Sequence, residues 1–210
     1  MTTLVEAALA RSDRYLREFV EALHLCPYAR RCRESGKLHR RVVLGPQDAL
    51  EAVRAVEALP EDSVEVALLI FPNAAADGLQ SARAFEAFCV ELREQRSHAH
   101  DGASPFYCVA FHPDLPRDLE SAHRAVQFIR RSPDPTIQLV RAAVLRAVRG
   151  SGEGGTRIID PSALTLEQLM AISSPLSLSD RIAEANFATL QAHGPDAIDG
   201  LLASLRAPEA

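Results

Sequence analysis

The feature that most constrains the fold is an alternation of short apolar, β-rich runs with longer amphipathic segments. Each amphipathic segment is long enough for a helix, and crossovers of this kind join parallel strands with a right-handed turn. The alternation therefore predicts an α/β fold with a three- to four-stranded, mainly parallel sheet flanked by helices. The runs are "RRVVLG" (40–45), "VEVALLIFP" (64–72) and "PFYCVAFHP" (105–113), and the helical segments between them are 47–59 and 79–95.

Helical periodicity dominates the rest of the chain. Residues 3–25 predict a first helix, capped by one of the two leading threonines. Pro27 would disrupt a helix interior but can begin a new turn, so Cys26 is expected at a junction between two helical pieces, the second of which Gly36 closes. Beyond the third apolar run, helices are predicted over 120–130, 136–149, 164–172, 178–193 and 195–206.

Two short segments interrupt the helical C-terminal third. The glycine-rich stretch "RGSGEGGTR" (149–157) is typical of a loop or hinge, and "RIID" (157–160) predicts a short edge strand. No internal repeat is visible. We therefore expect one α/β domain over residues 1–210, with a helical extension from about residue 160.

Composition limits the classes of function. A formal net charge of -5 argues against a general nucleic-acid binder, which needs a basic face to neutralise phosphates. The N-terminal segment carries early acidic residues and no uninterrupted apolar stretch, unlike a signal peptide or a membrane span. The four cysteines are too few and too irregularly spaced for a disulfide scaffold, and we expect thiols in a reducing compartment. These features predict a cytoplasmic protein that acts on a small molecule, without nucleic acid or membrane as a partner.

Polar residues follow two of the predicted strands. Asn73 comes directly after the second apolar run, and His112 ends the third. Since parallel strands bring their carboxyl ends to one edge, where ligands of α/β proteins bind, both side chains are candidates for a site. His112 would be an acid, base or ligand, and Asn73 an amide donor or acceptor. In the alternative, Asn73 caps the next helix and His112 bonds a backbone carbonyl near a turn.

Two adjacent arginines precede the next turn of the chain. Arg130 and Arg131 could bind a carboxylate or a phosphate, helped by the N-terminus of the helix expected from Thr136. A solvated basic pair is the alternative. Ser132 follows in the context Arg-Ser-Pro, which lacks the GxSxG elbow of hydrolases, so we do not expect it to be a nucleophile.

Four ordered motifs resemble the bacterial family catalogued as domain of unknown function 1415. Members of that family carry Leu-Cys-Pro-Phe-Ala, a strand ending in Phe-Pro-Asn, a Phe-His-Pro element and Arg-Ser-Pro-Tyr-Pro-Thr-Leu-His-Leu-Leu-Arg, in that order. The resemblance covers residues 19–146. The corresponding segments here are "LCPYA" (25–29), "LLIFPNA" (68–74), "FHP" (111–113) and "RSPDPTIQLVR" (131–141).

The chain departs from the family pattern at three positions. Asp134 stands where the family usually has Tyr, Gln138 where it has His, and Arg130 where it tends to have Asn. The missing second histidine argues against a metal site built from two histidines. The residues that the resemblance carries over are Cys26, Asn73, His112, Arg131 and Ser132.

Cys26 is the central candidate for chemistry. A thiolate at this position would be stabilised by His24, Arg30, Arg31 and the start of the following helical turn. The structural alternative is a half-buried thiol that closes the helix junction. If the thiol is accessible, two kinds of chemistry compete.

In the first, Cys26 is the nucleophile of a metal-free enzyme, and His112 is its base. The histidine would be oriented by Asn73 or Asp114, as in triads that activate a thiol. This hypothesis requires the cysteine and the histidine to meet in space.

In the second, Cys26 is the thiolate ligand of heme iron, where the sulfur favours oxygen–oxygen bond cleavage. The Cys-Pro step at a helix start is similar to the proximal segment of heme-thiolate peroxygenases. His112 would be the distal acid and base, and Arg31 or the Arg131–Ser132 turn would hold a propionate. This hypothesis, a small-molecule oxidoreductase with heme as cofactor and Cys26 as metal ligand, is the one that we favour from the sequence.

A third hypothesis is a binding or assembly protein without catalysis. The alanine-rich C-terminal segment "DRIAEANFATLQAHG" could pack on a second copy as readily as on the core, which would make a homodimer. A scaffold of this kind would keep its fold and its partner when Cys26 and His112 are replaced.

Overall fold

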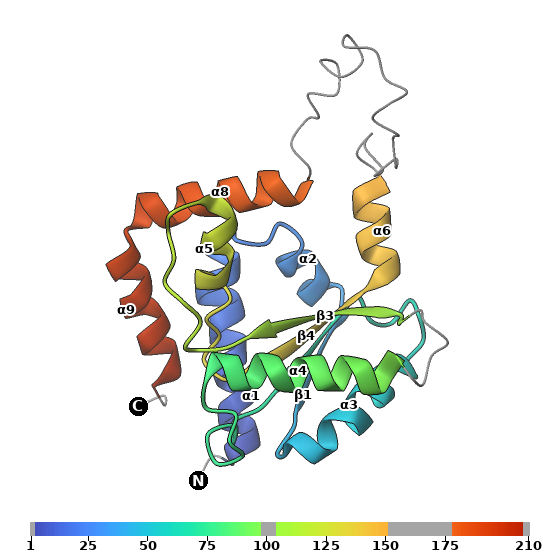
Figure 1. The fold of residues 1–210 in the computed structure, drawn as a ribbon. Coiled ribbons are helices and arrows are strands. Elements are labelled where there is room, and N and C mark those ends of the chain that lie inside the picture. The colour runs from blue at the N-terminus through green and yellow to red at the C-terminus, as the bar shows by residue number, and fades with distance from the viewer. Residues whose placement is uncertain (1–2, 98–103, 151–177, 208–210) are drawn as a thin grey trace, which may run out of the picture.

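The structure is a computed structural model that describes residues 3–97, 104–150 and 178–207. Its centre is a four-stranded sheet in the order β1-β2-β4-β3 (Figure 1). The strands are β1 (Leu38–Val42), β2 (Val66–Ile70), β3 (Phe106–Phe111) and β4 (Thr136–Arg141). The predicted α/β class and the three strands expected from the apolar runs are therefore confirmed, with boundaries shifted by a few residues.

The sheet is mixed, so the predicted mainly parallel arrangement is correct only in part. β1 pairs with β2 in parallel, whereas β4 runs antiparallel to both β2 and β3. It follows that β1, β2 and β3 all point the same way and that β4 is inserted between two of them. Ile70 and Phe111, which end β2 and β3, both pair with Thr136 at the start of β4. The carboxyl ends of β2 and β3 thus share one edge, as the sequence predicted.

The prediction of a helix over 136–149 is wrong for its first part, because Thr136–Arg141 forms β4. Only the second part is helical, as α6 (Ala142–Gly150). Along β4 the side chains alternate between the two faces of the sheet. Ile137 and Leu139 are fully buried in the core on one face, and Gln138 and Val140 line a cavity on the other. This alternation and the β-branched residues of the segment suit a strand, which here pairs with β2 on one side and β3 on the other.

Two helices cover one face of the sheet. They are α3 (Ala49–Glu57), which follows a short 3₁₀ turn at Pro46–Asp48, and α4 (Ala82–Ser97). Phe85 and Leu92 of α4 pack with Leu69 and Phe71 in the largest apolar cluster. Cys89 is buried in the same cluster.

The N-terminal helix lies on the opposite face of the sheet from α4 (Figure 1). It begins as α1 (Leu4–Arg14) and continues as a π-helix, η1 (Tyr15–Glu21), so the prediction of a helix from residue 3 is confirmed. Thr3 caps it through a reciprocal pair of hydrogen bonds with Glu6. After the turn at Cys26 comes α2 (Ala29–Glu34), the second helical piece that the sequence predicted.

Three further helices complete the described fold: α5 (Ala122–Phe128), α8 (Leu178–His193) and α9 (Pro195–Arg206). α8 packs across α5 and α9 returns beside η1, so the apolar residues of the C-terminal helices bury against this chain's own core (Figure 1). The last two helices match their predicted ranges. The expected strand at 157–160, the helix at 164–172, nearly all of the 149–157 loop and the start of the helical extension lie outside the described residues.

Candidate functional site

A cavity of about 490 Å³ lies on the face of the sheet that carries α1. It is lined by all four strands, by α1 and η1, by α2 and the turn before it, and by α5, α6 and α8. Most of its lining is apolar. The sheet contributes Val66, Leu68, Ile70, Phe111, Thr136, Gln138 and Val140, all on the face opposite the α3–α4 core.

Cys26 lies in the wall of this cavity and is exposed to solvent. The preceding residue, Leu25, is 4% exposed and packs among η1, α5 and the C-terminal helices. Its N–H donates to the carbonyl of Val20 at 2.9 Å, and the carbonyl of Cys26 accepts from Ala29 at 3.2 Å. Buried and hydrogen-bonded neighbours therefore fix the backbone of Cys26, and the residue itself is exposed in the cavity wall.

The segment before Cys26 has two uncommon backbone features. The seven residues of η1 form a π-helix, a rare conformation that is frequent at functional sites. His24 has φ of 54°, in the left-handed region that non-glycine residues seldom adopt. These features turn the chain sharply at the point where Cys26 enters the cavity wall.

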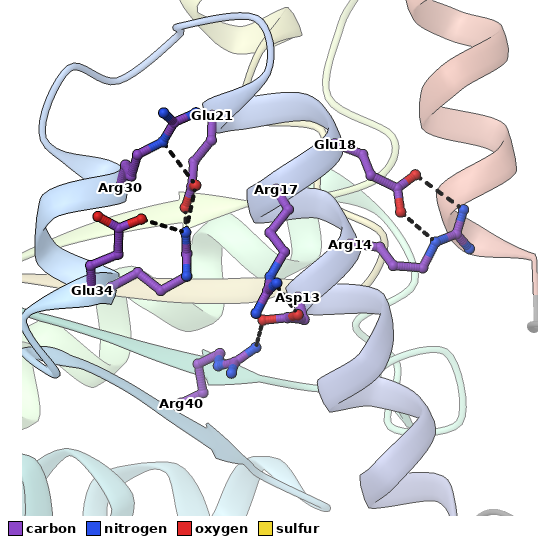
Figure 2. Close-up of polar contacts among 9 residues, drawn as sticks. Asp13, Arg14, Arg17, Glu18, Glu21, Arg30, Glu34 and Arg40 are labelled. Carbon is purple, nitrogen blue, oxygen red and sulfur yellow. Dashed lines mark hydrogen bonds and ion pairs between the residues drawn. The ribbon is translucent and has the colours of Figure 1, made fainter.

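A buried ion pair ties this turn to α2 (Figure 2). Glu21, whose side chain is 4% exposed, accepts hydrogen bonds from Nε and Nη2 of Arg33 at 2.7 and 2.9 Å. Arg30 lies 3.6 Å from the same carboxylate. These hydrogen bonds from Arg33 lower the pKa of Glu21 in spite of its burial. The pair closes the turn that carries Cys26.

The cations expected to activate Cys26 are engaged elsewhere. Arg30 belongs to the Glu21 cluster, and Arg31 pairs with Glu65 at 3.2 Å. Neither guanidinium is therefore left as an uncompensated charge beside the thiol. Accessibility, rather than a surplus of positive charge, is what sets Cys26 apart.

The other three cysteines are less accessible than Cys26. Burial raises the pKa of Cys32 to about 11 and that of Cys89 to about 12, and it also raises the pKa of Cys108. Cys32 lines the cavity from α2, but it is only 4% exposed. Because a thiolate is the reactive form, these three thiols are poor nucleophiles near neutral pH.

Several polar side chains are among the residues that line the cavity. Ser132 donates its hydroxyl to the carbonyl of Asp134 at 2.6 Å. The Asp134 carboxylate accepts from Nε and Nη2 of Arg11 at 2.9 and 2.8 Å. Arg130 and Asn186 also line the cavity. Ser132 is thus the second of the residues carried over from the family resemblance that lines the same cavity as Cys26. The three positions where the chain departs from the family pattern, Arg130, Asp134 and Gln138, line this cavity as well.

His112 lies on the other face of the sheet. It is 1% exposed, and its ring packs at a tilt of 43° against that of Phe85 on α4, with 5.8 Å between the ring centroids. Nδ1 accepts from the N–H of Asp114 at 3.0 Å, which places the proton on Nε2, 3.3 Å from the carbonyl of Leu79. Burial lowers its pKa, so the imidazole is neutral. The structure therefore does not bring His112 and Cys26 together.

Asn73 and Arg131 follow the shared edge of the sheet but contact other elements. Asn73 donates through Nδ2 to the carbonyl of Leu44 at 3.3 Å. Arg131 donates to the carbonyl of Pro113 at 3.2 Å, pairs with Asp199 of α9 and lies over the ring of Phe128. These contacts hold loops and α9 in place, away from Cys26.

Two features of the site were not predicted from the sequence. Asn186 lies in an alanine-rich helix without any motif around it, and it lines the cavity only because α8 packs there. The π-helix likewise has an ordinary amphipathic sequence. Both depend on contacts between segments that are far apart in the chain.

Comparison with known proteins gives one match. The model of a family described as "Protein of unknown function (DUF1415)" matches residues 7–173, which include Cys26 and the sheet. No curated protein and no solved structure matches the chain. Among the described residues, no group of three or more His, Cys, Asp and Glu side chains could hold a metal ion, and no helix is long and apolar enough to cross a membrane.

Proposed function

The chain belongs to the DUF1415 family of proteins of unknown function, and we propose that it is a thiol-dependent oxidoreductase that acts on a small, largely apolar molecule. The observation that carries the proposal is the position of Cys26, an exposed thiol in the wall of a large apolar cavity. Substrate pockets of small-molecule enzymes have this size and lining.

The redox step that suits this arrangement is reduction of an organic hydroperoxide. Cys26 first loses its proton to solvent, and the thiolate sulfur attacks the outer peroxide oxygen. A sulfur–oxygen bond forms, the oxygen–oxygen bond breaks, and the leaving alkoxide takes a proton to become an alcohol. A small thiol such as dithiothreitol then reduces the sulfenic acid, which regenerates the Cys26 thiol and gives a disulfide and water.

The acid/base roles expected of His112 and Asn73 are not part of this proposal. His112 is neutral, fully hydrogen-bonded and on the opposite face of the sheet, and Asn73 is bonded to the carbonyl of Leu44. Proton transfer in the reaction above can use solvent, because Cys26 is exposed. We infer that both residues support the shared edge of the sheet.

Ligation of heme iron by Cys26 is the second candidate. The observation that favours it is the volume and apolar lining of the cavity, together with a half-buried guanidinium, that of Arg130, in its wall. Arg130 could bind a propionate, in place of Arg31 and Arg131, which pair with Glu65 and Asp199. When bound, the heme would supply peroxide-dependent oxidation chemistry, with Cys26 as the thiolate ligand.

One pair of measurements separates the two candidates. Turnover of cumene hydroperoxide with dithiothreitol is measured for the wild-type protein, for Cys26→Ser and for Cys32→Ser as the matched control. Absorption from about 300 to 700 nm is recorded before and after hemin is added to the wild type and to Cys26→Ala, since a Soret band reports the iron ligand.

We expect turnover that Cys26→Ser abolishes and Cys32→Ser retains, without a Cys26-dependent Soret band. A Soret band that shifts or disappears in Cys26→Ala would support heme ligation instead. If neither turnover nor the Soret band depends on Cys26, both proposals are wrong and a binding protein without catalysis becomes the better explanation.

The setting of this activity is also part of the proposal. The net charge of -5 and the free thiols favour a cytoplasmic enzyme of small-molecule metabolism that does not act on nucleic acid or at a membrane. A homodimer stays a prediction, and sedimentation of the purified protein over a range of concentrations would test it.

A further inference from the structure

We propose that the cavity takes an amphipathic monocarboxylate, whose carboxylate Arg130 binds and whose apolar chain lies along the sheet toward Cys26. This inference deepens the proposed function by naming the substrate class, and it rests on the cavity being the functional site. It does not depend on what Cys26 does chemically. Three observations on the described residues carry it: an arginine that pairs with none of their carboxylates, the amide of a buried asparagine that makes no hydrogen bond to them, and an apolar wall.

Arg130 is held rigidly in the turn between α5 and β4. Its N–H donates to the carbonyl of Gln127 at 3.1 Å, and its own carbonyl accepts from His112 at 3.1 Å and from Ser132 at 3.0 Å. The side chain is half-buried and lines the cavity. Within the described part of the chain, no carboxylate pairs with its guanidinium.

The contrast with the neighbouring residue is direct, because Arg131 pairs with Asp199 of α9. Burial lowers the pKa of Arg130, and it raises the pKa of the neighbouring Tyr15 hydroxyl, which therefore supplies no counter-charge near neutral pH. A half-buried cation without a counter-ion is costly to the empty protein. A carboxylate in the cavity would remove that cost through charge-assisted hydrogen bonds.

Asn186 supplies the second, independent observation. It lies on α8, lines the cavity and is 5% exposed. Its amide makes no hydrogen bond to any residue in the parts of the chain that the structure describes. The amide atoms are not fully enclosed, so they can bond water in the empty cavity and a polar group of a ligand in the filled one. The amide can donate to a carboxylate oxygen.

The remaining lining decides the chemistry of the rest of the ligand. Leu68, Ile70, Phe111 and Val140 form an apolar floor on the sheet, which suits an alkyl or aryl chain and not a sugar or a peptide. The acidic lining residues Glu65 and Asp134 are already paired with arginine or lysine side chains. One unpaired cation in the described lining matches a monoanion better than a phosphate dianion.

The test compares two ligands that differ only in the head group. Binding of decanoate and of 1-decanol to the full chain is measured by calorimetry for the wild type, Arg130→Gln and Asn186→Asp. Arg124→Gln is the matched control, because it removes an exposed guanidinium from α5 at the surface. Cys26→Ser is included so that binding and chemistry are read separately. Binding of 1-decanol also shows that each variant keeps the cavity.

We expect Arg130→Gln to weaken decanoate binding about tenfold or more and to leave 1-decanol binding within about twofold, since only the charged head group loses its partner. Asn186→Asp adds a negative charge to the cavity lining and should also weaken decanoate binding. Arg124→Gln and Cys26→Ser should bind decanoate as the wild type does.

Equal affinity of the wild type for decanoate and 1-decanol, or unchanged decanoate binding by Arg130→Gln, would overturn the inference. Neither result would contradict the proposed thiol chemistry. That proposal is tested separately, by measuring whether turnover of cumene hydroperoxide depends on Cys26. Conversely, loss of that turnover would leave the carboxylate site standing.

Discussion

Glu21 accepts two hydrogen bonds from the guanidinium of Arg33 in a pair whose carboxylate is almost wholly buried. The two residues lie on either side of the turn that carries Cys26, at the end of η1 and within α2. The pair therefore connects the stability of the N-terminal segment to the position of the candidate reactive thiol.

Glu21→Gln should lower the free energy of unfolding by about 2 kcal/mol, because a buried charge-assisted pair is lost and Arg33 keeps partial contact with solvent. Urea denaturation at neutral pH measures the change. Glu18→Gln is the matched control, since that carboxylate is exposed and pairs with Arg14 at the surface, where an ion pair contributes little. Equal effects of the two substitutions would contradict the structural role given to Glu21.

The contribution of Glu21 should also depend on pH. Its pKa is lowered from 4.5 in the folded state by the hydrogen bonds from Arg33, so the folded form binds this proton less tightly than the unfolded form. The stabilisation is therefore complete above about pH 4.5 and is lost as the pH falls through the lowered value. The stability difference between the wild type and Glu21→Gln, measured in urea at about pH 7, 4 and 3, should shrink on acidification. A constant difference would mean that the carboxylate charge does not matter.

Arg130→Leu should stabilise the empty protein by about 1 kcal/mol, because it replaces a half-buried cation that pairs with no carboxylate of the described residues by an apolar side chain. Thermal unfolding without ligand measures this effect. In the presence of decanoate the order should reverse, since the wild type alone gains the ionic contact. A variant less stable than the wild type without ligand would show that Arg130 has a structural role instead.

Replacement of His112 should affect stability and not the reactivity of Cys26. His112→Asn removes a buried ring that bonds both Asp114 and Leu79, and it should cost about 2 kcal/mol in urea denaturation. The alkylation rate of Cys26 by iodoacetamide should stay within about twofold of the wild type, as the two residues lie on opposite faces of the sheet. A large fall in that rate with the fold intact would restore His112 as the base.

The same histidine gives the wild type a characteristic pH dependence. The folded-state pKa of His112 is lowered from 6.5 by burial, so the unfolded state binds its proton more tightly. Its contribution is present above about pH 6.5 and declines as the pH falls through that value toward the lowered one. His112→Asn should remove this part of the slope.

The sequence predicted the elements of the fold better than their pairing. Apolar runs identified β1, β2 and β3, and amphipathic periodicity identified the first and last helices. The segment at β4 was assigned to a helix because Ile137, Val140 and Val144 are spaced as in a helix. A short apolar run fits either period, and the open position between β2 and β3 decided for a strand.

The site shows the same limit. Cys26 was identified from its Cys-Pro context and the turn around it, and Arg130 from its place before a turn that was expected to lead into a helix and leads into β4 instead. The face to which His112 points depends on how the side chains alternate along β3. Phe111 faces the cavity, and the next residue, His112, faces α4. Both faces of that strand are partly apolar, so the sequence pattern cannot assign the side.

The most direct test of the account is the rate at which Cys26 gains one oxygen atom from cumene hydroperoxide, followed by intact mass as decanoate is added. If the thiol acts on molecules held in the cavity, the rate should fall and saturate at the decanoate concentration that fills the site, with Arg130→Gln needing about tenfold more decanoate. An oxidation rate that stays constant while calorimetry shows bound decanoate would contradict the claim that Cys26 and the cavity form one site.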